Sequence, residues 1–262
     1  MEPLLDVQAL TMSFGGLRAL DGVSLRVQPG EVVALIGPNG AGKTTFFNCI
    51  TGIYRPSGGD IFVTPPGRKR RRLNGLKTHQ VTAQGLARTF QNIRLFPGMT
   101  VLENVMIGRH CRTRAGVLGA ILRDPQTRRE EREIVERSYA ILEKIGLADQ
   151  VNELAKNLPY GDQRRLEIAR AMATEPFLLL LDEPAAGMNP RETDALEALI
   201  RRICDEEGIA VLLIEHDMRI VMSISNRIYV LDYGKKIASG TAAEIWENPV
   251  VIKAYLGEET ED

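Results

Sequence analysis

An apolar run that leads directly into a glycine-rich loop constrains the fold of this chain more than any other feature. VVALI (32–36) is followed by GPNGAGKTT (37–45). A short, continuous apolar run that ends in glycine is typical of a strand buried on both faces of a parallel sheet. The loop matches G-x-x-x-x-G-K-[S/T] between a predicted strand and a predicted helix, which is the context that a phosphate-binding loop requires. The chain is therefore predicted to form an α/β domain around a nucleotide phosphate site.

The residue types of this loop suit anionic phosphate groups. Glycines let the backbone curl so that successive N–H groups face the phosphates, and the following helix start adds positive potential. We expect Lys43 to reach the β- and γ-phosphates and the Thr44 hydroxyl to bind Mg²⁺. The loop residues predicted to bind ATP are Gly37, Asn39, Gly40, Ala41, Gly42, Lys43, Thr44 and Thr45.

Two further apolar runs, Phe177–Leu181 and Ile209–Ile214, are predicted to join the same parallel sheet. DEPAAG follows the first run and EHD follows the second. Ligands of open α/β sheets bind at the carboxyl ends of the strands, so the three polar exits are expected to meet at one site. Three unrelated buried strands with polar turns are the alternative.

Side chains at these strand ends are candidates for catalysis, together with Lys43. Asp182 is placed to hold the magnesium shell, and Glu183, next in sequence, to polarise the attacking water as a general base. His216 is placed to contact the γ-phosphate or to hold that water. The alternatives are two surface carboxylates that follow a core strand, and a purely structural histidine.

The remaining sequence predicts two additions to this core. Residues 1–30 and Asp60–Val63 approach apolar/polar alternation, which indicates a small antiparallel β lobe. Residues 100–157 are predicted to be mostly helical, with Thr127–Glu130 as a capping box and Gly146 closing the helix after it. This helical block interrupts the core sequence, so we expect an inserted subdomain.

Two segments each have two possible roles. Gln91 is an uncharged amide on a predicted loop between the β lobe and the helical block. It is placed either to sense magnesium and a partner, or to serve as an ordinary loop residue. The basic run Arg68–Arg72 either touches anionic lipid head groups or forms a solvated, mobile loop, and we favour the loop.

Composition argues against several other classes. Lys plus Arg number 33 against 34 Asp plus Glu, whereas dedicated nucleic-acid binders carry a basic excess, so no nucleic-acid partner is expected. The apolar runs are far shorter than the ~18 residues of a membrane span, and the start lacks a signal-peptide layout. We expect a cytoplasmic protein that reaches a membrane only through a partner. Cys49, Cys111 and Cys204 are expected to be reduced and structural.

The ordered motifs resemble those of the ATP-binding cassette (ABC) ATPases. GPNGAGKTT, Gln91, LPYGDQRR, LLLLDEP and EHD follow the order of that family, and the resemblance covers essentially the whole chain. It implies an α/β core of the P-loop NTPase (RecA-like) type with an antiparallel β lobe and an inserted α-helical subdomain. It also implies ATP and Mg²⁺ as cofactors, and subunits that dimerise head to tail around two ATPs. On this basis 1–98 holds the β lobe and phosphate-loop core, 99–163 the helical subdomain, and 164–262 the rest.

Longer segments are similar to the ATPases of bacterial branched-chain amino acid importers. They are ARTFQNIRLFPGMTVLENVMIG, LPYGDQRRLEIARAM, LDEPAAGMNP and NPVVIKAYLG. This resemblance implies a subunit on the cytoplasmic face of the inner membrane that drives permease subunits and depends indirectly on a periplasmic binding protein. Its partner in the dimer is a second copy or a second cassette ATPase. A cassette for another cargo, such as lipopolysaccharide, and a soluble cassette outside transport are the alternatives.

The resemblance also implies roles for single residues. Phe14 falls at the family's adenine-stacking position, against the alternative of a core phenylalanine of the β lobe. Gln91 is counted with Thr44 and Asp182 among the magnesium ligands. Asn189 replaces the aspartate that most cassettes carry in the loop crossing the dimer interface, which puts the usual carboxylate contacts there in doubt.

The segment LPYGDQ departs from the LSGGQ of most cassettes, whose serine and glycines hold the γ-phosphate across the dimer. Pro159 replaces the serine, Tyr160 the first glycine and Asp162 the glutamine. Gly161 and the start of the helix that follows remain, and free N–H groups at a helix start attract phosphate. Asp162 either opposes this attraction or caps the helix. We predict a working half-site that acts through the backbone.

Overall fold

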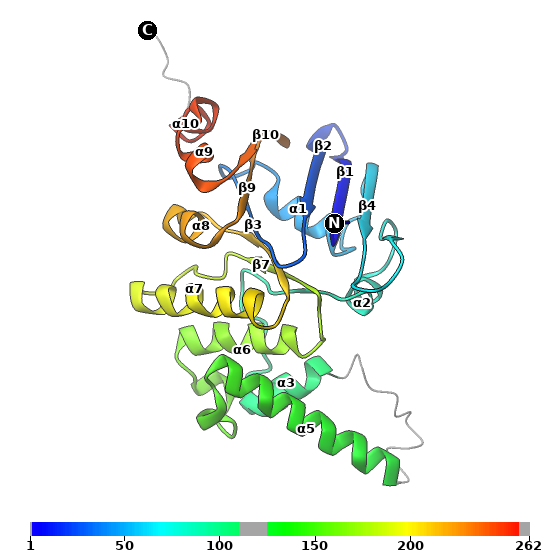
Figure 1. The fold of residues 1–262 in the computed structure, drawn as a ribbon, viewed down its shortest axis with the longest axis vertical. Helices are drawn as coiled ribbons and strands as arrows, with labels where there is room; N and C mark the ends of the chain where they lie inside the picture. The colour runs from blue at the N-terminus through cyan, green and yellow to red at the C-terminus, as the bar shows by residue number, and fades with distance from the viewer. Residues whose placement is uncertain (1, 110–124, 257–262) are drawn as a thin grey trace. The chain divides into compact units, whose positions relative to one another are not determined.

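The computed structural model describes residues 2–109 and 125–256 of the 262-residue chain (Figure 1). Contacts divide the chain into two compact units, each described here by itself. The first comprises Met1–Arg88 and Phe177–Asp262, and the second comprises Thr89–Pro176. Within the described residues, no helix combines the length and the apolar character that a membrane span requires.

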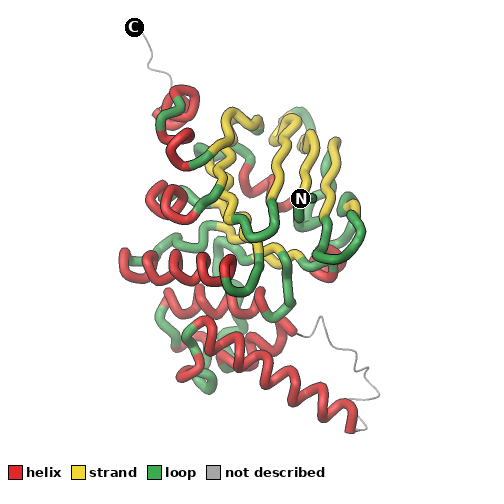
Figure 2. The backbone as a smooth tube through the Cα atoms, viewed as in Figure 1, coloured by secondary structure: helices red, strands yellow, loops and turns green. Residues whose placement is uncertain are grey.

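The first unit contains a six-stranded sheet in the order β10-β9-β3-β8-β7-β6. Strands are drawn in yellow in Figure 2. Its strands are β3 (Val32–Ile36), β6 (Leu86–Arg88), β7 (Leu178–Asp182), β8 (Ala210–Ile214), β9 (Arg227–Asp232) and β10 (Lys235–Gly240). Neighbouring strands run parallel except β10, which pairs antiparallel with β9. Every residue of β3, β7 and β8 is buried. The three predicted parallel strands are therefore confirmed, with small shifts at their ends.

Helices of the same unit follow these strands along the chain. They are α1 (Lys43–Ile50), α2 (Thr78–Ala83), α7 (Pro190–Asp205), α8 (Met218–Ile224), α9 (Ala242–Trp246) and α10 (Pro249–Leu256). Cys49 on α1 and Cys204 on α7 are buried free thiols, as predicted, and burial raises the pKa of Cys49 to about 11. Cys111 lies outside the described residues.

A second sheet of this unit forms the predicted antiparallel β lobe. Its order is β2-β1-β4-β5, with β1 (Leu5–Phe14), β2 (Leu17–Val27), β4 (Gly58–Val63) and β5 (Arg71–Arg72). Buried side chains of this lobe, such as Leu5, Leu10 and Ile61, join Phe46 and Phe47 of α1 in one hydrophobic core. The lobe and the phosphate-loop helix therefore stabilise each other by burial of apolar surface.

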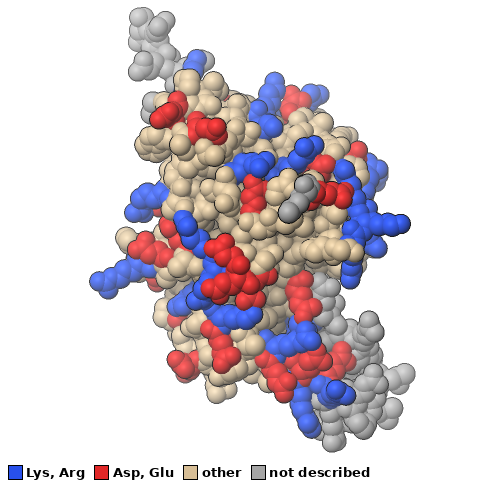
Figure 3. Space-filling model, viewed as in Figure 1, with Lys and Arg blue, Asp and Glu red and all other residues tan. Residues whose placement is uncertain are grey.

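All five residues of the basic run are exposed, and Arg68–Arg70 lie outside helices and strands, in line with the solvated loop that we favoured. Arg71 and Arg72 form β5 and pair with β4. The Arg70 Nη2 lies 2.8 Å from the Asp6 Oδ2, and its guanidinium lies 4.0 Å from the centre of the Phe62 ring. The contact between Arg70 and Asp6 was not predicted, because the two residues lie 64 positions apart along the chain. Lys and Arg side chains gather on the side of the molecule where β4 lies (Figure 3).

The second unit is helical, as predicted. It contains α3 (Val101–Arg109), α5 (Pro125–Ile145) and α6 (Tyr160–Met172), with short 3₁₀ turns at Ala148–Gln150 and Ala155–Asn157. Gly146 (φ 78°) ends α5. Its N–H bonds to the Glu143 carbonyl, and the Leu147 N–H bonds to the Leu142 carbonyl, a Schellman motif that confirms the predicted helix end.

The predicted start of that helix is wrong. Thr127 lies inside α5, which already includes Pro125, and so cannot be its N-cap. The sequence pattern of a capping box does not by itself locate a helix end, because the same residue types occur within helices.

Candidate nucleotide-binding site

The phosphate loop is held in a conformation that glycine requires. Gly37 has φ 147°, and a Cβ there would lie 2.0 Å from the Leu231 carbonyl oxygen at the end of β9. Gly42 has φ 100°, and its Cβ would lie 2.7 Å from the Ala19 carbonyl oxygen in the β lobe. Larger residues at either position would push the loop away from its supporting strands. The sheet and the lobe together therefore shape this loop.

The start of α1 presents backbone N–H groups to the loop. Gly42 is its N-cap and carries no side chain to cap it, and the first turn has no acidic residue among those described. Of the predicted loop residues, Asn39, Gly40 and Thr44 are exposed, Thr45 is half-buried and Ala41 is buried. An anion placed here would meet open N–H groups and the positive end of the helix dipole.

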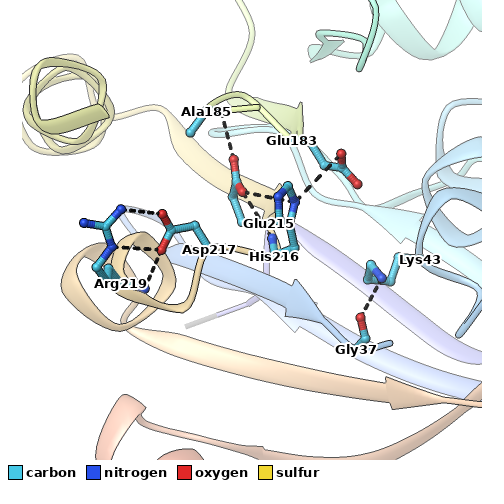
Figure 4. Close-up of polar contacts among 8 residues, drawn as sticks. All are labelled: Gly37, Lys43, Glu183, Ala185, Glu215, His216, Asp217 and Arg219. Carbon is cyan, nitrogen blue, oxygen red and sulfur yellow. Dashed lines mark hydrogen bonds and ion pairs between the residues drawn. The ribbon is translucent and has the colours of Figure 1, made fainter. Parts of the chain in front are cut away.

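Lys43 folds back over the same loop. Its Nζ donates hydrogen bonds to the Gly37 carbonyl at 2.7 Å and to the Pro38 carbonyl at 2.9 Å (Figure 4). Burial lowers the pKa of Lys43, although the charges of Glu183 and Asp182 raise it. The phosphate loop and the carboxylates after β7 therefore meet at one place, as the strand pattern predicted.

Asp182 ends β7 and is buried, with an arginine beside it. The Arg88 Nη2 lies 2.7 Å from the Asp182 Oδ2, and the Arg88 Nη1 donates to the Asn48 side-chain oxygen at 2.7 Å. Sequence reasoning missed Arg88. Its one signal in the sequence was a charged residue directly after the short apolar pair Leu86–Ala87.

The residues predicted to bind metal are compatible with Mg²⁺ bound together with a nucleotide. Thr44 and Asp182 offer hydroxyl and carboxylate oxygens, which are ligands that Mg²⁺ prefers, and Mg²⁺ at such sites completes its shell with phosphates and water. Within residues 2–109 and 125–256, no group of three or more His, Cys, Asp or Glu side chains could hold a metal ion. The protein alone therefore supplies only part of a magnesium shell.

Glu183 and His216 lie next to each other. The His216 Nδ1 is 3.9 Å from the Glu183 Oε2, and the two side chains are 65% and 23% exposed respectively. This exposure places His216 outside the hydrophobic core, and its role in hydrolysis stays a prediction. Both side chains are therefore partly open to solvent, and Figure 4 shows them next to each other.

The β lobe places Phe14 at its surface. The ring is 42% exposed and meets Tyr54 edge to face, with 5.2 Å between ring centres. The alternative of a core phenylalanine is therefore wrong, and stacking on adenine stays a prediction.

Asn189, the residue that replaces an aspartate of other cassettes, caps a helix. Its side-chain oxygen accepts a hydrogen bond from the Glu192 N–H at 3.1 Å, while the Glu192 carboxylate accepts from the Asn189 N–H at 2.9 Å. This reciprocal capping box starts α7. A helix cap tolerates either Asn or Asp, so the replacement fits the local fold.

In the second unit, LPYGDQ leads directly into α6. The helix begins at Tyr160, before Gly161 rather than after it as predicted, with Pro159 as N-cap and Gly161 buried in the first turn. The Asp162 carboxylate does not cap the helix, because it is bound by Arg165 and by the Gln150 side-chain amide. Its negative charge is therefore paired rather than directed at the open N–H groups.

The same helix holds the Gln91 loop. Arg164, which is 2% exposed, donates to the Phe90 carbonyl at 2.7 Å and also to the Gln91 carbonyl. The Glu167 carboxylate accepts from the Phe90 N–H at 3.4 Å and from the Arg94 N–H at 3.3 Å. Sequence reasoning missed this pair, whose signal was two charges within the apolar face of α6. Approach of Gln91 or Gly161 to a phosphate loop stays a prediction.

Comparison with known proteins identifies the family. The ABC transporter family model matches residues 20–186, which is more than half of the chain and includes the phosphate loop and both carboxylates. The chain belongs to the ABC transporter family of ATP-binding cassettes. A second model, described as branched-chain amino acid ATP-binding cassette transporter, matches residues 235–261 of the cassette.

Relatives match the cassette over nearly its whole length. It is 51% identical over 257 residues to the high-affinity branched-chain amino acid transport ATP-binding protein LivG of Salmonella typhimurium, covering 98% of this chain and 99% of LivG. It is 51% identical over 256 residues to BraF of Pseudomonas aeruginosa, a protein with the same description, covering 98% of each. A solved ABC transporter cassette in its ADP conformation superposes with a TM-score of 0.84 at 32% identity, covering 98% of this chain and 100% of that one. The predicted fold class is thus confirmed, and the cassette is a nucleotide-binding ATPase.

Proposed function

We propose that this cassette hydrolyses ATP to drive the import of branched-chain amino acids through membrane permease subunits. The observation that carries the choice of cargo is the 51% identity to LivG, which extends over 98% of this chain. The match of residues 235–261 to the branched-chain family model supports the same cargo, since those residues lie outside the general cassette match.

ATP binds in this proposal with its β- and γ-phosphates on the loop after β3. Lys43 exchanges its two loop carbonyls for phosphate oxygens, while the N–H groups at the start of α1 bind the same phosphates. Thr44 and Asp182, with Gln91 as the third predicted ligand, would hold Mg²⁺, which would supply positive charge beside the phosphate oxygens. Phe14 stacks on the adenine.

Hydrolysis depends on the two side chains at the ends of β7 and β8. Glu183 takes a proton from the attacking water, and a carboxylate that is partly exposed can receive that water from solvent. His216 lies beside Glu183 and orients the water or the γ-phosphate. The water oxygen bonds to the γ-phosphorus as the bond to the oxygen bridging the β- and γ-phosphates breaks. ADP and inorganic phosphate then leave the loop.

The LPYGDQ segment completes the ATP site of a neighbouring cassette. Gly161 lies in the first turn of α6, whose N–H groups have no side-chain cap, and the Asp162 charge is paired. A neighbour's γ-phosphate would therefore meet backbone donors and the positive end of a helix. The partner is a second copy of this chain or another cassette ATPase.

The cellular setting follows from this assembly. We place the cassette on the cytoplasmic face of the inner membrane, bound there by permease subunits, with a periplasmic binding protein delivering the amino acid on the other side. The loop that contains Gln91, and the helices that follow it, would transmit the closing of the dimer to the permease. Nucleic acid has no part in this function.

The general base is tested by Glu183→Gln, with Glu206→Gln on the same unit as the matched control. Glu183→Gln should bind ATP normally by calorimetry but hydrolyse it about 10²–10⁴-fold more slowly, the usual effect of losing a general base. Glu206→Gln should behave as wild type, because this exposed residue lies at the end of α7. Full turnover by Glu183→Gln would remove it from the mechanism.

Sharing of the site is tested with the isolated cassette. Turnover per molecule should be low and should rise with protein concentration, since the segment that completes each site comes from a neighbour. A full transporter rate that does not depend on concentration would contradict the shared site.

A further inference from the structure

Glu215, between the end of β8 and His216, is a buried carboxylate. Its side chain is only 1% exposed, although an ionised carboxylate is stable in a protein interior only when it is hydrogen-bonded or paired. Its Oε1 accepts a hydrogen bond from the Ala185 N–H at 2.9 Å, and its Oε2 accepts one from the His216 N–H at 3.1 Å (Figure 4). One side chain thus binds the backbone of two loops that come from different strands.

The first of these loops carries a strained residue. Glu183 has φ 48°, in the left-handed region that glycine favours. It also precedes Pro184, and a residue before proline normally adopts an extended conformation. Such backbone conformations persist only when surrounding bonds fix them, and they cluster at functional sites.

The end of β8 supplies those bonds on both sides of the strained residue. The Glu183 N–H donates to the Ile214 carbonyl at 2.9 Å. The Ala185 N–H, beyond Pro184, donates to the Glu215 carboxylate at 2.9 Å. The strained Glu183 and Pro184 are therefore held between one bond to the backbone of β8 and one bond to the Glu215 side chain.

Glu215 and Glu183 lie in different environments. Burial raises the pKa of Glu215, while hydrogen bonds from the Ala185 and His216 N–H groups lower it. The His216 Nδ1 lies 3.9 Å from an oxygen of each carboxylate. Glu183 reaches solvent with 23% of its side chain exposed, so it is the carboxylate that can meet water, while Glu215 is enclosed.

We propose that Glu215 is a positioning residue for ATP hydrolysis, whose carboxylate fixes the Glu183 loop and the His216 loop in one arrangement. The proposal rests on the proposed roles of Glu183 and His216 and names what holds them in place. Glu215 itself touches neither ATP nor the attacking water. Its removal should therefore lower the rate of hydrolysis and leave nucleotide binding at the phosphate loop unchanged.

Two substitutions at Glu215 remove different numbers of its hydrogen-bond acceptors. Glu215→Ala removes both acceptors and leaves the Ala185 N–H buried without a partner. Glu215→Gln keeps one carbonyl acceptor but places an N–H₂ group where the second acceptor was. We expect ATP turnover to fall about 10²-fold in Glu215→Ala, the scale for a misplaced catalytic group, and by a smaller factor in Glu215→Gln. The dissociation constant for ATP should stay within about twofold in both, since Lys43 and its loop are untouched.

A double substitution distinguishes positioning from general damage. In a Glu183→Gln background, adding Glu215→Ala should cause a smaller further loss in single-turnover hydrolysis than it causes alone, because the Glu183 carboxylate is already gone and only the positioning of His216 remains to be lost. Glu31→Gln is the matched control. Glu31 is also a buried carboxylate of this unit, bonded to the Gln28 N–H and to Arg227, and its loss should lower stability without changing turnover per folded molecule.

The outcomes distinguish a failure of the positioning role from a failure of the proposed function. Wild-type turnover by Glu215→Ala, alongside slow Glu183→Gln, overturns the positioning role alone. The positioning role is also overturned if Glu215→Ala lowers turnover by the same factor in the Glu183→Gln background as it does alone, because that result indicates general structural damage. Full turnover by Glu183→Gln overturns the proposed function itself. If Glu215→Ala does not fold, Glu215→Gln carries the same comparison, with a loss in turnover at unchanged ATP affinity as the supporting result.

Discussion

Arg164→Met should destabilise the cassette more than an ordinary core substitution. Arg164 and Glu167 are each 2% exposed and form an ion pair one helical turn apart, with 3.4 Å between Nη1 and Oε2. The substitution keeps the apolar bulk of the side chain but removes its charge. Glu167 stays buried and loses the cation that pairs with it, keeping the weaker effect of the Arg170 charge. The carbonyls of Phe90 and Gln91 lose the guanidinium that donates to them.

The magnitude follows from this burial. Removing one partner of a buried ion pair costs about 3–5 kcal/mol, because the remaining charge stays desolvated. Replacing both partners with apolar residues of similar size is often neutral. Arg164→Met combined with Glu167→Leu should therefore recover most of the loss, to within about 1–2 kcal/mol of wild type, since the two positions are strongly coupled.

The loss should also depend on pH. Burial raises the pKa of Glu167 above its ordinary 4.5, against the charge of Arg164, which lowers it. Without Arg164 this pKa rises further, so in the window above 4.5 the folded state binds more protons than the unfolded state. Lowering the pH through that window favours the folded state. The destabilisation of Arg164→Met should consequently shrink as the pH falls toward 4.5.

Urea unfolding followed by circular dichroism measures the loss, and hydrogen exchange locates it. The Phe90 and Arg94 amides, which donate to Glu167, should exchange faster in the variant. A loss below about 1 kcal/mol, or a double variant as unstable as the sum of the single losses, would refute the reasoning from a buried pair.

Three other substitutions test the phosphate contacts. Lys43→Ala should fail at nucleotide binding, because a cation facing two phosphates is lost, and normal ATP affinity by calorimetry would contradict that role. Pro159→Ser should change turnover by less than about tenfold, since one added hydroxyl donor provides at most a single hydrogen bond in a site not built for it; a larger gain would mean that the backbone half-site is incomplete. Gly161→Val should abolish ATP-driven dimerisation seen by light scattering while the monomer still binds nucleotide, because a branched side chain blocks close backbone approach. Dimerisation and turnover at wild-type levels in Gly161→Val would mean that LPYGDQ is a vestige.

The parts of the fold that sequence predicted are those with local patterns. The parallel strands β3, β7 and β8 are continuous apolar runs with polar exits, and the phosphate loop has its glycines and lysine at fixed spacing. The β9–β10 hairpin was missed, although IYVL in β9 is a comparable apolar run that a search for further strands would have found.

The parts that sequence did not predict depend on distant partners. Arg88 meets a carboxylate 94 positions away along the chain, and Arg70 meets one 64 positions away. Glu215 was not predicted, because the EHD motif indicates a function for His216 and none for the glutamate before it. Its role depends on the strained backbone at Glu183, and no local pattern records that strain. Charged residues that become buried are thus the ones that a single sequence describes least well.

Uptake of leucine tests the central claim most directly. The cassette, its permease subunits, any partner cassette and the periplasmic binding protein are produced together in bacteria that lack high-affinity branched-chain amino acid uptake. Accumulation of radiolabelled leucine is measured with wild type and with an equal amount of Glu183→Gln. The account predicts saturable uptake with wild type, reduced by competing isoleucine or valine, and none above background with Glu183→Gln. Equal uptake with both proteins, or no branched-chain uptake with a wild-type cassette that is active as an ATPase, would contradict it.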